Sequence, residues 1–235
     1  MTRISEYFPD DKMISLISED YRLLQVMSRF GIPLGFGDKS VKEVCEDNGV
    51  DCLTFLNVVN FMNDPDSYES GDTTLSLESL LHYLQQSHAY FLEFCLPAIR
   101  RKLLDGIILR DSDVSFLIIK LFDEYVEGVR EHMRHEEDNL FKLVSAIINN
   151  EELPLINLST YSDHHEEVSS KLKELKNIII KYCPPDSRVN LLNAALYDIY
   201  RCEEELGSHC KVEDRLLMPA IEKYTRSSSQ DSKPL

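Results

Sequence analysis

Two segments of the sequence place a histidine four residues before a glutamate. The first runs from His132 to Glu136 and the second from His209 to Glu213, and both fit the pattern H-x3-E-[ED]-x-x-L-[FM]. In an α-helix, a spacing of four residues puts two side chains on one face, one turn apart. Each segment can therefore direct an imidazole and a carboxylate at the same point, as metal ligands on a helix do.

Two further histidines lie upstream at matching distances. His88 precedes His132 by 44 residues and His164 precedes His209 by 45, with one short turn between helices inside each pair. At about 1.5 Å rise per residue, the two members of a pair reach similar heights on antiparallel helices. We therefore expect the four histidines and two glutamates to converge in one layer of a helical core.

Four neutral imidazoles and two carboxylates suit two divalent metal ions that the carboxylates bridge. Iron fits this donor set best, because structural zinc sites prefer four ligands in a tetrahedron. Other divalent metals remain alternatives, and so does a metal-free interpretation, since a lone histidine on an apolar helix face is usually a core residue. The sequence predicts six metal ligands: His88, His132, Glu136, His164, His209 and Glu213.

The elements that must position these residues are long amphipathic helices. Apolar residues recur at spacings of three and four over residues 76–104, 111–149, 159–182 and 187–224, and the six predicted ligands lie on those apolar faces. The connections within the first pair and within the second pair are short, which makes the paired helices antiparallel. The expected fold is all-α, with a four-helix up-down bundle over residues 76–224.

A small helical domain is expected over residues 1–64, followed by a polar linker at 65–75. Its helical patterns cover residues 12–30, 41–47 and 51–62, and Ser40 and Asp51 are the expected N-caps of the last two. Residues 225–235, which contain three consecutive serines, are expected to form a disordered tail.

The composition excludes several classes of function. The formal net charge is -16, so nucleic acid is not an expected partner. The sequence shows neither a signal peptide nor an apolar run long enough for a membrane helix, which favours a cytoplasmic protein without a membrane partner. The six cysteines include no C-x-x-C pair and are expected to be free thiols. With no catalytic triad, phosphate loop or nucleotide fingerprint, no catalytic residue is predicted.

The H-x3-E pairs, the sequence Ser87-His88-Ala89 and the His164 of Asp-His-His-Glu resemble a hemerythrin-like domain. The two-part organisation is similar to the repair-of-iron-centres (RIC) family of di-iron proteins, over residues 8–224. This resemblance implies two oxo- or hydroxo-bridged iron ions, with Glu136 and Glu213 as the bridging carboxylates and the four histidines as terminal ligands. It also implies a role in restoring iron–sulfur clusters that nitric oxide or oxidants have damaged.

The sequence departs from the family pattern in two places. The family has one more histidine near the end of the first bundle helix, whereas residues 103–113 contain none. One metal is therefore expected to take water, a nearby aspartate or a remaining histidine. The family's N-terminal Cys-Cys pair has no counterpart in residues 30–37. The remaining histidines, His82, His135 and His165, lie off the apolar faces and are weaker candidates.

Four functions remain open. The first is an iron-handling stress protein that acts on iron–sulfur proteins, and the second is a module that binds or senses dioxygen or nitric oxide. The third is an enzyme that oxidises iron or reduces nitric oxide, and the fourth is a metal-free helical interaction protein. The sequence favours a metal-binding or iron-donating protein over a classical enzyme, and it leaves the oligomeric state undetermined.

Overall fold

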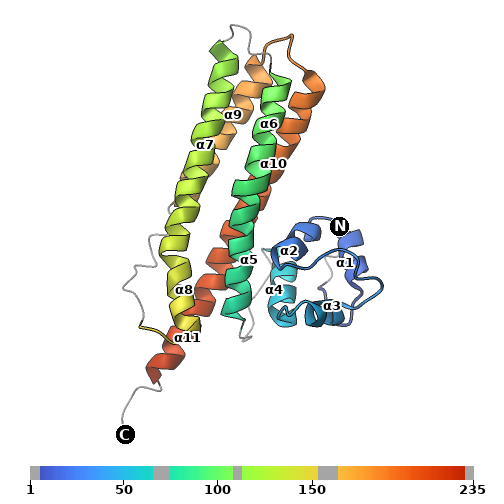
Figure 1. Ribbon diagram of the computed structural model, residues 1–235, viewed down its shortest axis with the longest axis vertical. Helices are drawn as coiled ribbons and strands as arrows, with labels where there is room; N and C mark the ends of the chain where they lie inside the picture. Colours follow the sequence, from blue (N-terminus) through green and yellow to red (C-terminus); the bar gives the residue numbers. More distant parts are fainter. Residues whose placement is uncertain (1–5, 66–74, 108–112, 153–163, 231–235) are drawn as a thin grey trace. The chain divides into compact units, whose positions relative to one another are not determined.

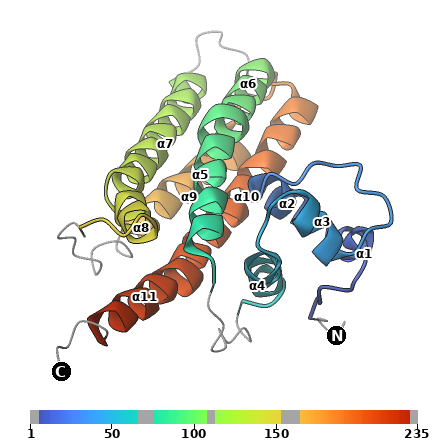
Figure 2. The ribbon, with the colours of Figure 1, turned by 60° about the horizontal axis from the view of Figure 1, so that its bottom comes forward.

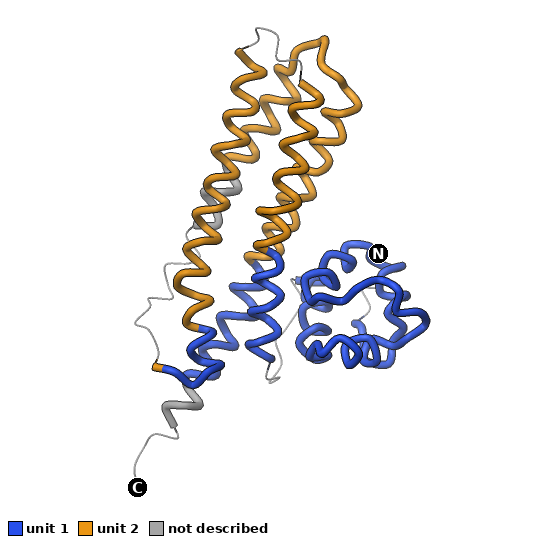
Figure 3. Tube along the Cα trace, viewed as in Figure 1, with its two compact units in different colours: residues 1–87, 144–151, 211–235 blue, residues 88–143, 152–210 orange. Residues whose placement is uncertain are grey.

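The computed structural model describes residues 6–65, 75–107, 113–152 and 164–230, except for the side chains of 164–170 and 226–230. Every named element in these ranges is helical, apart from one antiparallel bridge between Lys12 and Ser40, so the predicted all-α class is confirmed. Among the described helices, none combines the length and apolarity needed to cross a membrane. Two compact units make up the chain (Figure 3): unit 1 comprises residues 1–87, 144–151 and 211–235, and unit 2 comprises residues 88–143 and 152–210.

Unit 2 is a four-helix bundle with the predicted up-down order (Figure 1). Its first helix continues from the end of α5 (Leu77–Ala89) through η1 (Tyr90–Cys95) into α6 (Leu96–Gly106). The second is α7 (Asp113–Asp138), which resumes after Asn139 as α8 (Leu140–Ile148). The third and fourth are α9 (His164–Tyr182) and α10 (Val189–Val212). The predicted starts of the second and third helices, residues 111 and 159, lie outside the described residues.

Many side chains of the bundle core lie on the apolar faces that the periodicity predicts, and others lie next to those faces. Burying one leucine, isoleucine or phenylalanine side chain stabilises a fold by about 1.5–3 kcal/mol, so these faces hold the helices in a fixed register. That register determines the height of each polar residue on the same faces. The core includes Leu96, Ile99, Leu103, Ile118, Phe122, Val129, Leu172, Leu175, Ile179, Leu192, Ala195 and Ile199.

The end of α6 approaches the start of α10 closely at Gly106. The Gly106 carbonyl oxygen accepts a hydrogen bond of 2.9 Å from the Arg188 N–H. A Cβ atom at Gly106 would lie 2.9 Å from Leu192 Cδ2 and 3.2 Å from the Leu192 backbone nitrogen. We therefore expect Gly106→Ala to lower the free energy of unfolding by about 1–3 kcal/mol, which urea denaturation would measure.

Gly207, in the interior of α10, is the matched control. Within the part of the chain that the structure describes, no atom outside its own stretch of helix lies within 4 Å of the position that a Cβ would occupy. Gly207→Ala is expected to raise the free energy of unfolding by about 0.5–1 kcal/mol, because alanine loses less conformational entropy in a helix. A Gly106→Ala variant that gains stability as Gly207→Ala does would contradict the steric argument.

Unit 1 contains four short N-terminal helices, which lie together in Figure 2: α1 (Met13–Glu19), α2 (Leu23–Arg29), α3 (Val41–Asp47) and α4 (Cys52–Asn63). Both predicted N-caps are confirmed, since Ser40 accepts a hydrogen bond from the Glu43 N–H and Asp51 accepts one from the Thr54 N–H. In each case the side chain satisfies a backbone donor that the first helical turn leaves free.

The single helix predicted over residues 12–30 is wrong, because α1 ends at Glu19 and α2 begins at Leu23. The Asp20 carboxylate accepts hydrogen bonds from both the backbone N–H and the guanidinium of Arg22. Such local bonds give the backbone an alternative to helical hydrogen bonding and stop a helix despite a favourable apolar pattern.

Unit 1 also includes most of α5, which contacts the N-terminal helices. The rings of Phe30 and Tyr83 lie 4.9 Å apart, and the Ser76 N–H donates a 2.8 Å hydrogen bond to Thr54 Oγ1. Later in the chain, α10 continues through η3 (Glu213–Leu217) into α11 (Met218–Gln230), which ends beyond the predicted helix end at residue 224. Most of the predicted linker, residues 66–74, and the end of the predicted tail, residues 231–235, lie outside the described residues.

Candidate metal centre

A buried carboxylate of α7, Glu136, lies among three of the predicted histidine ligands. Its Oε2 atom is 3.1 Å from His88 Nε2 and 4.0 Å from His209 Nε2, and its Oε1 atom is 3.0 Å from His132 Nε2. Bonds from metals to nitrogen and oxygen are about 2.0–2.2 Å long, so adjacent donors on one ion lie about 3 Å apart. The two Glu136 oxygens thus have spacings to His88 and His132 that suit metal coordination.

Glu213 adds a second carboxylate. It follows His209 by one turn of the continuous helix formed by α10 and η3, and it is buried. Two groups of donor atoms in the described residues could each hold a metal ion, because the atoms within a group lie within 4.8 Å of one another. Glu213 belongs to both groups, which are His88, Glu136, His209 and Glu213, and His132, Cys210 and Glu213.

The His88 imidazole is fixed in orientation by its neighbours. Its ring stacks on Phe141 with a centroid distance of 4.9 Å, and its Nδ1 atom lies 2.9 Å from Glu137 Oε1. An ionised carboxylate only accepts hydrogen bonds, so Nδ1 carries the proton and Nε2 keeps the lone pair that a metal requires. Phe91 meets the His209 ring at 6.1 Å in an edge-on contact. These aromatic contacts restrict the rotation of both imidazoles.

Two π-helical segments accompany the proposed ligands. The segment η1 begins at Tyr90, two residues after His88, and η3 begins at Glu213 itself. Short π-helical turns are rare inside α-helices and occur frequently at functional sites. An extra residue in a helical turn changes which face the following side chains occupy, so each segment shifts the helix register next to the cluster.

The cluster favours a positive charge. Burial alone lowers the pKa of His132, but its interactions with Cys210 and with the Glu136 carboxylate outweigh burial and raise the pKa of His132 to about 9. A buried carboxylate needs a cationic partner to offset the loss of hydration. In the metal-free protein the protonated imidazole supplies that charge, and a bound metal cation would supply it instead.

The structure brings five of the predicted ligands into this cluster: His88, His132, Glu136, His209 and Glu213. The sixth, His164, begins α9, and its side chain lies outside the described residues, as does that of His165. His82 and His135 are exposed to solvent.

The structure adds two residues to the cluster that the sequence did not predict. Glu137 orients His88. In the sequence it is the second acidic residue of the H-x3-E-[ED] motif, which could have indicated a role for it. Cys210 joins His132 and Glu213, although the sequence counted it only as one of six free thiols. Its one signal was its position directly after His209.

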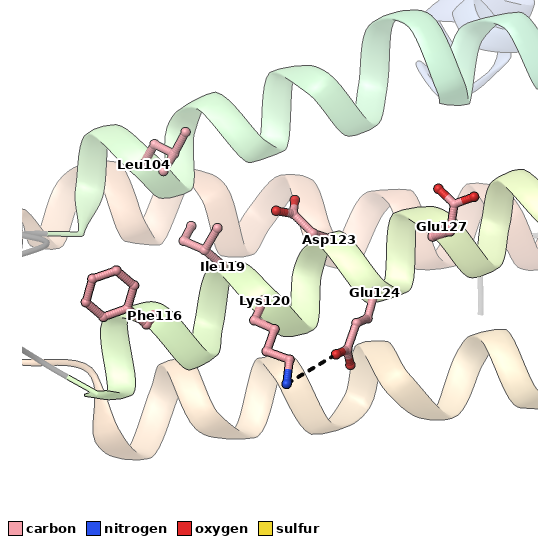
Figure 4. Close-up of a pocket in the computed structure, with 7 residues that line it drawn as sticks. All are labelled: Leu104, Phe116, Ile119, Lys120, Asp123, Glu124 and Glu127. Carbon is pink, nitrogen blue, oxygen red and sulfur yellow. Dashed lines mark ion pairs between the residues drawn. The ribbon is translucent and has the colours of Figure 1, made fainter.

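A shallow hollow elsewhere on the bundle, between α6 and α7, is shown in Figure 4. It has a volume of about 540 Å³, and two of its lining residues, Lys120 and Glu124, form an ion pair of 3.7 Å. Neither histidine nor cysteine lines it, so it offers none of the donors that the cluster offers. Its lining residues are Leu104, Phe116, Ile119, Lys120, Asp123, Glu124 and Glu127.

Comparison with known proteins agrees with the geometry. The chain is 19% identical over 197 residues to the iron-sulfur cluster repair protein ScdA of Staphylococcus haemolyticus (strain JCSC1435), an alignment that covers 82% of this chain and 89% of that protein. Residues 79–221 match the hemerythrin HHE cation binding domain, and this range contains all six predicted ligands. The chain therefore belongs to the hemerythrin HHE cation-binding domain family.

Proposed function

We propose that the chain binds two iron ions in the bundle and uses this iron in the repair of iron–sulfur clusters. The observation that carries the proposal is the position of Glu136, whose two oxygens lie 3.1 Å from His88 and 3.0 Å from His132. A carboxylate with a different imidazole at each oxygen is suited to bridge two metals. Glu213, which belongs to both donor groups, is the proposed second bridge.

The proposed terminal ligands are the imidazoles of His88, His132, His164 and His209. Bound iron would supply redox chemistry and a store of metal for transfer. The chain's own residues hold and orient the donors: Glu137 fixes the tautomer of His88, and Phe141 stacks against its ring. The similarity to a protein named for iron–sulfur cluster repair supports iron–sulfur proteins as the partners.

A second candidate function is the reversible binding of dioxygen or nitric oxide. It is favoured by the smaller donor group of His132, Cys210 and Glu213, which contains three residues against four in the other group. A metal with three protein ligands keeps a coordination position for a small molecule. Nitrosative or oxidative stress would then be sensed at the same centre.

Anaerobic reconstitution with ferrous iron tests the proposal. We expect about two irons per chain after removal of loosely bound metal, because the donors form two adjacent groups. The loaded protein should then restore the absorption of a separately purified apo iron–sulfur protein when sulfide is supplied. Failure to retain any iron would overturn both candidate functions. Retention of iron that never reaches the acceptor, with a spectrum that responds to nitric oxide, would favour the second.

A further inference from the structure

Cys210 offers a sulfur donor, whereas the histidines and carboxylates around it offer nitrogen and oxygen. It lies one residue after His209 in α10, so its side chain is turned by about 100° from that of His209 around the helix axis. There its Sγ atom lies within 4.8 Å of the donor atoms of both His132 on α7 and Glu213. An imidazole, a thiol and a carboxylate thus converge from two helices.

We propose that Cys210 is a thiolate ligand of the metal ion that His132 holds. The inference rests on the proposed function, because it assigns a donor to one of the two proposed metal positions. The two positions then differ in chemistry. One has imidazole and carboxylate donors, whereas the other combines imidazole, carboxylate and sulfur.

Binding requires no oxidant or reductant. The Cys210 S–H bond breaks, its proton leaves to solvent, and the sulfur lone pair forms the bond to the divalent cation, whose oxidation state is unchanged. His132 binds in its neutral form and likewise gives up its extra proton. The half-buried position of Cys210 gives this proton a path to water that the fully buried His209 lacks.

A sulfur donor changes which metals the position prefers. Thiolates favour zinc, cobalt and iron over hard cations such as manganese and magnesium, which prefer oxygen ligands. The position that His132 faces should therefore select softer metals than the position between His88 and His209. Because the two positions then differ in their affinity for a given metal ion, we expect that ion to fill one position before the other.

Cobalt(II) is the probe that separates sulfur from other donors, because thiolate-to-cobalt charge transfer gives a near-ultraviolet band. The full-length metal-free protein would be titrated with cobalt(II) alone, without air. We expect the band to saturate at about one cobalt per chain even if a second cobalt binds, since only one position holds sulfur. Cys210→Ser should abolish the band and weaken that cobalt by about tenfold or more.

Cys183→Ser is the matched control. Cys183 is also partly buried, but it follows α9 and its thiol donates a hydrogen bond to Ser187. This variant should keep the full band. Circular dichroism would establish that both variants keep the helical content of the wild type.

Alkylation of the unmodified chain provides a measurement that needs no variant. Iodoacetamide followed by peptide mass spectrometry should modify Cys210 in the metal-free protein and spare it after cobalt is added, while Cys183 reacts equally in both. A charge-transfer band that survives Cys210→Ser, or cobalt binding that leaves Cys210 equally reactive, would overturn the thiolate assignment and leave the proposed function standing. Absence of any cobalt or iron binding would instead overturn the proposed function, and the thiolate ligand with it.

Discussion

Replacing Glu136 with glutamine is expected to abolish tight metal binding at both proposed positions. The Glu136 side chain is 1% exposed, and its oxygens lie 3.1 Å from His88 and 3.0 Å from His132, one on each side. A neutral amide of the same size removes the negative charge and gives one of the two sides an N–H group, which cannot bind a metal. Metal analysis after dialysis against a weak chelator would measure the loss.

The adjacent residue supplies the control for this substitution. Glu137 is half-exposed and accepts a hydrogen bond from His88 Nδ1, so it contacts the imidazole and not the space between the ligands. Glu137→Gln keeps an acceptor for this bond and should weaken metal binding by at most about tenfold. If Glu136→Gln still held two metal ions firmly, or if the two variants lost metal affinity equally, Glu136 would not be a bridging ligand.

The long helices could be predicted because the residues that recur at helical spacing are apolar, and the packing of the bundle buries apolar residues on one face of each helix. Ile99, Ile118 and Ile199 each lie on a predicted apolar face and each is buried in the bundle. The break between α1 and α2 could not be predicted in the same way. There the apolar pattern runs on, but the side chain of Asp20 binds the backbone of Arg22 and ends the helix. Local polar bonds of this kind do not alter hydrophobic spacing.

The candidate site was predictable as far as its donors lie on the apolar stripes. His132 and Glu136 share one face of α7 because four residues separate them, and the structure places their side chains 3.0 Å apart. Cys210 could not be found by this reasoning, because it lies beside the stripe that His209 marks. Cys210 belongs to the site because it lies close to His132 on another helix. The sequence of a single helix does not predict a contact between two helices.

The same contacts make the metal-free protein sensitive to pH. Burial alone lowers the pKa of His132, but the interactions with Cys210 and with the Glu136 carboxylate raise it from 6.5 to about 9. A raised folded-state pKa means that the protonated imidazole stabilises the fold fully below pH 6.5. This stabilisation is then lost as the pH rises through about 9. The shift corresponds to about 3 kcal/mol of unfolding free energy.

Urea denaturation of chelator-treated protein between pH 6 and pH 10 would measure this loss. The free energy of unfolding should fall across that interval in the wild type and fall much less in His132→Gln, whose amide does not titrate. Comparing the two chains removes the contribution of thiols and other groups that titrate in the same interval. Metal binding should change in the opposite direction, because the cation competes with the proton for the His132 lone pair and affinity rises as the proton leaves. A wild-type protein whose stability is flat over this interval, or whose slope His132→Gln reproduces, would show that His132 is neutral in the metal-free fold.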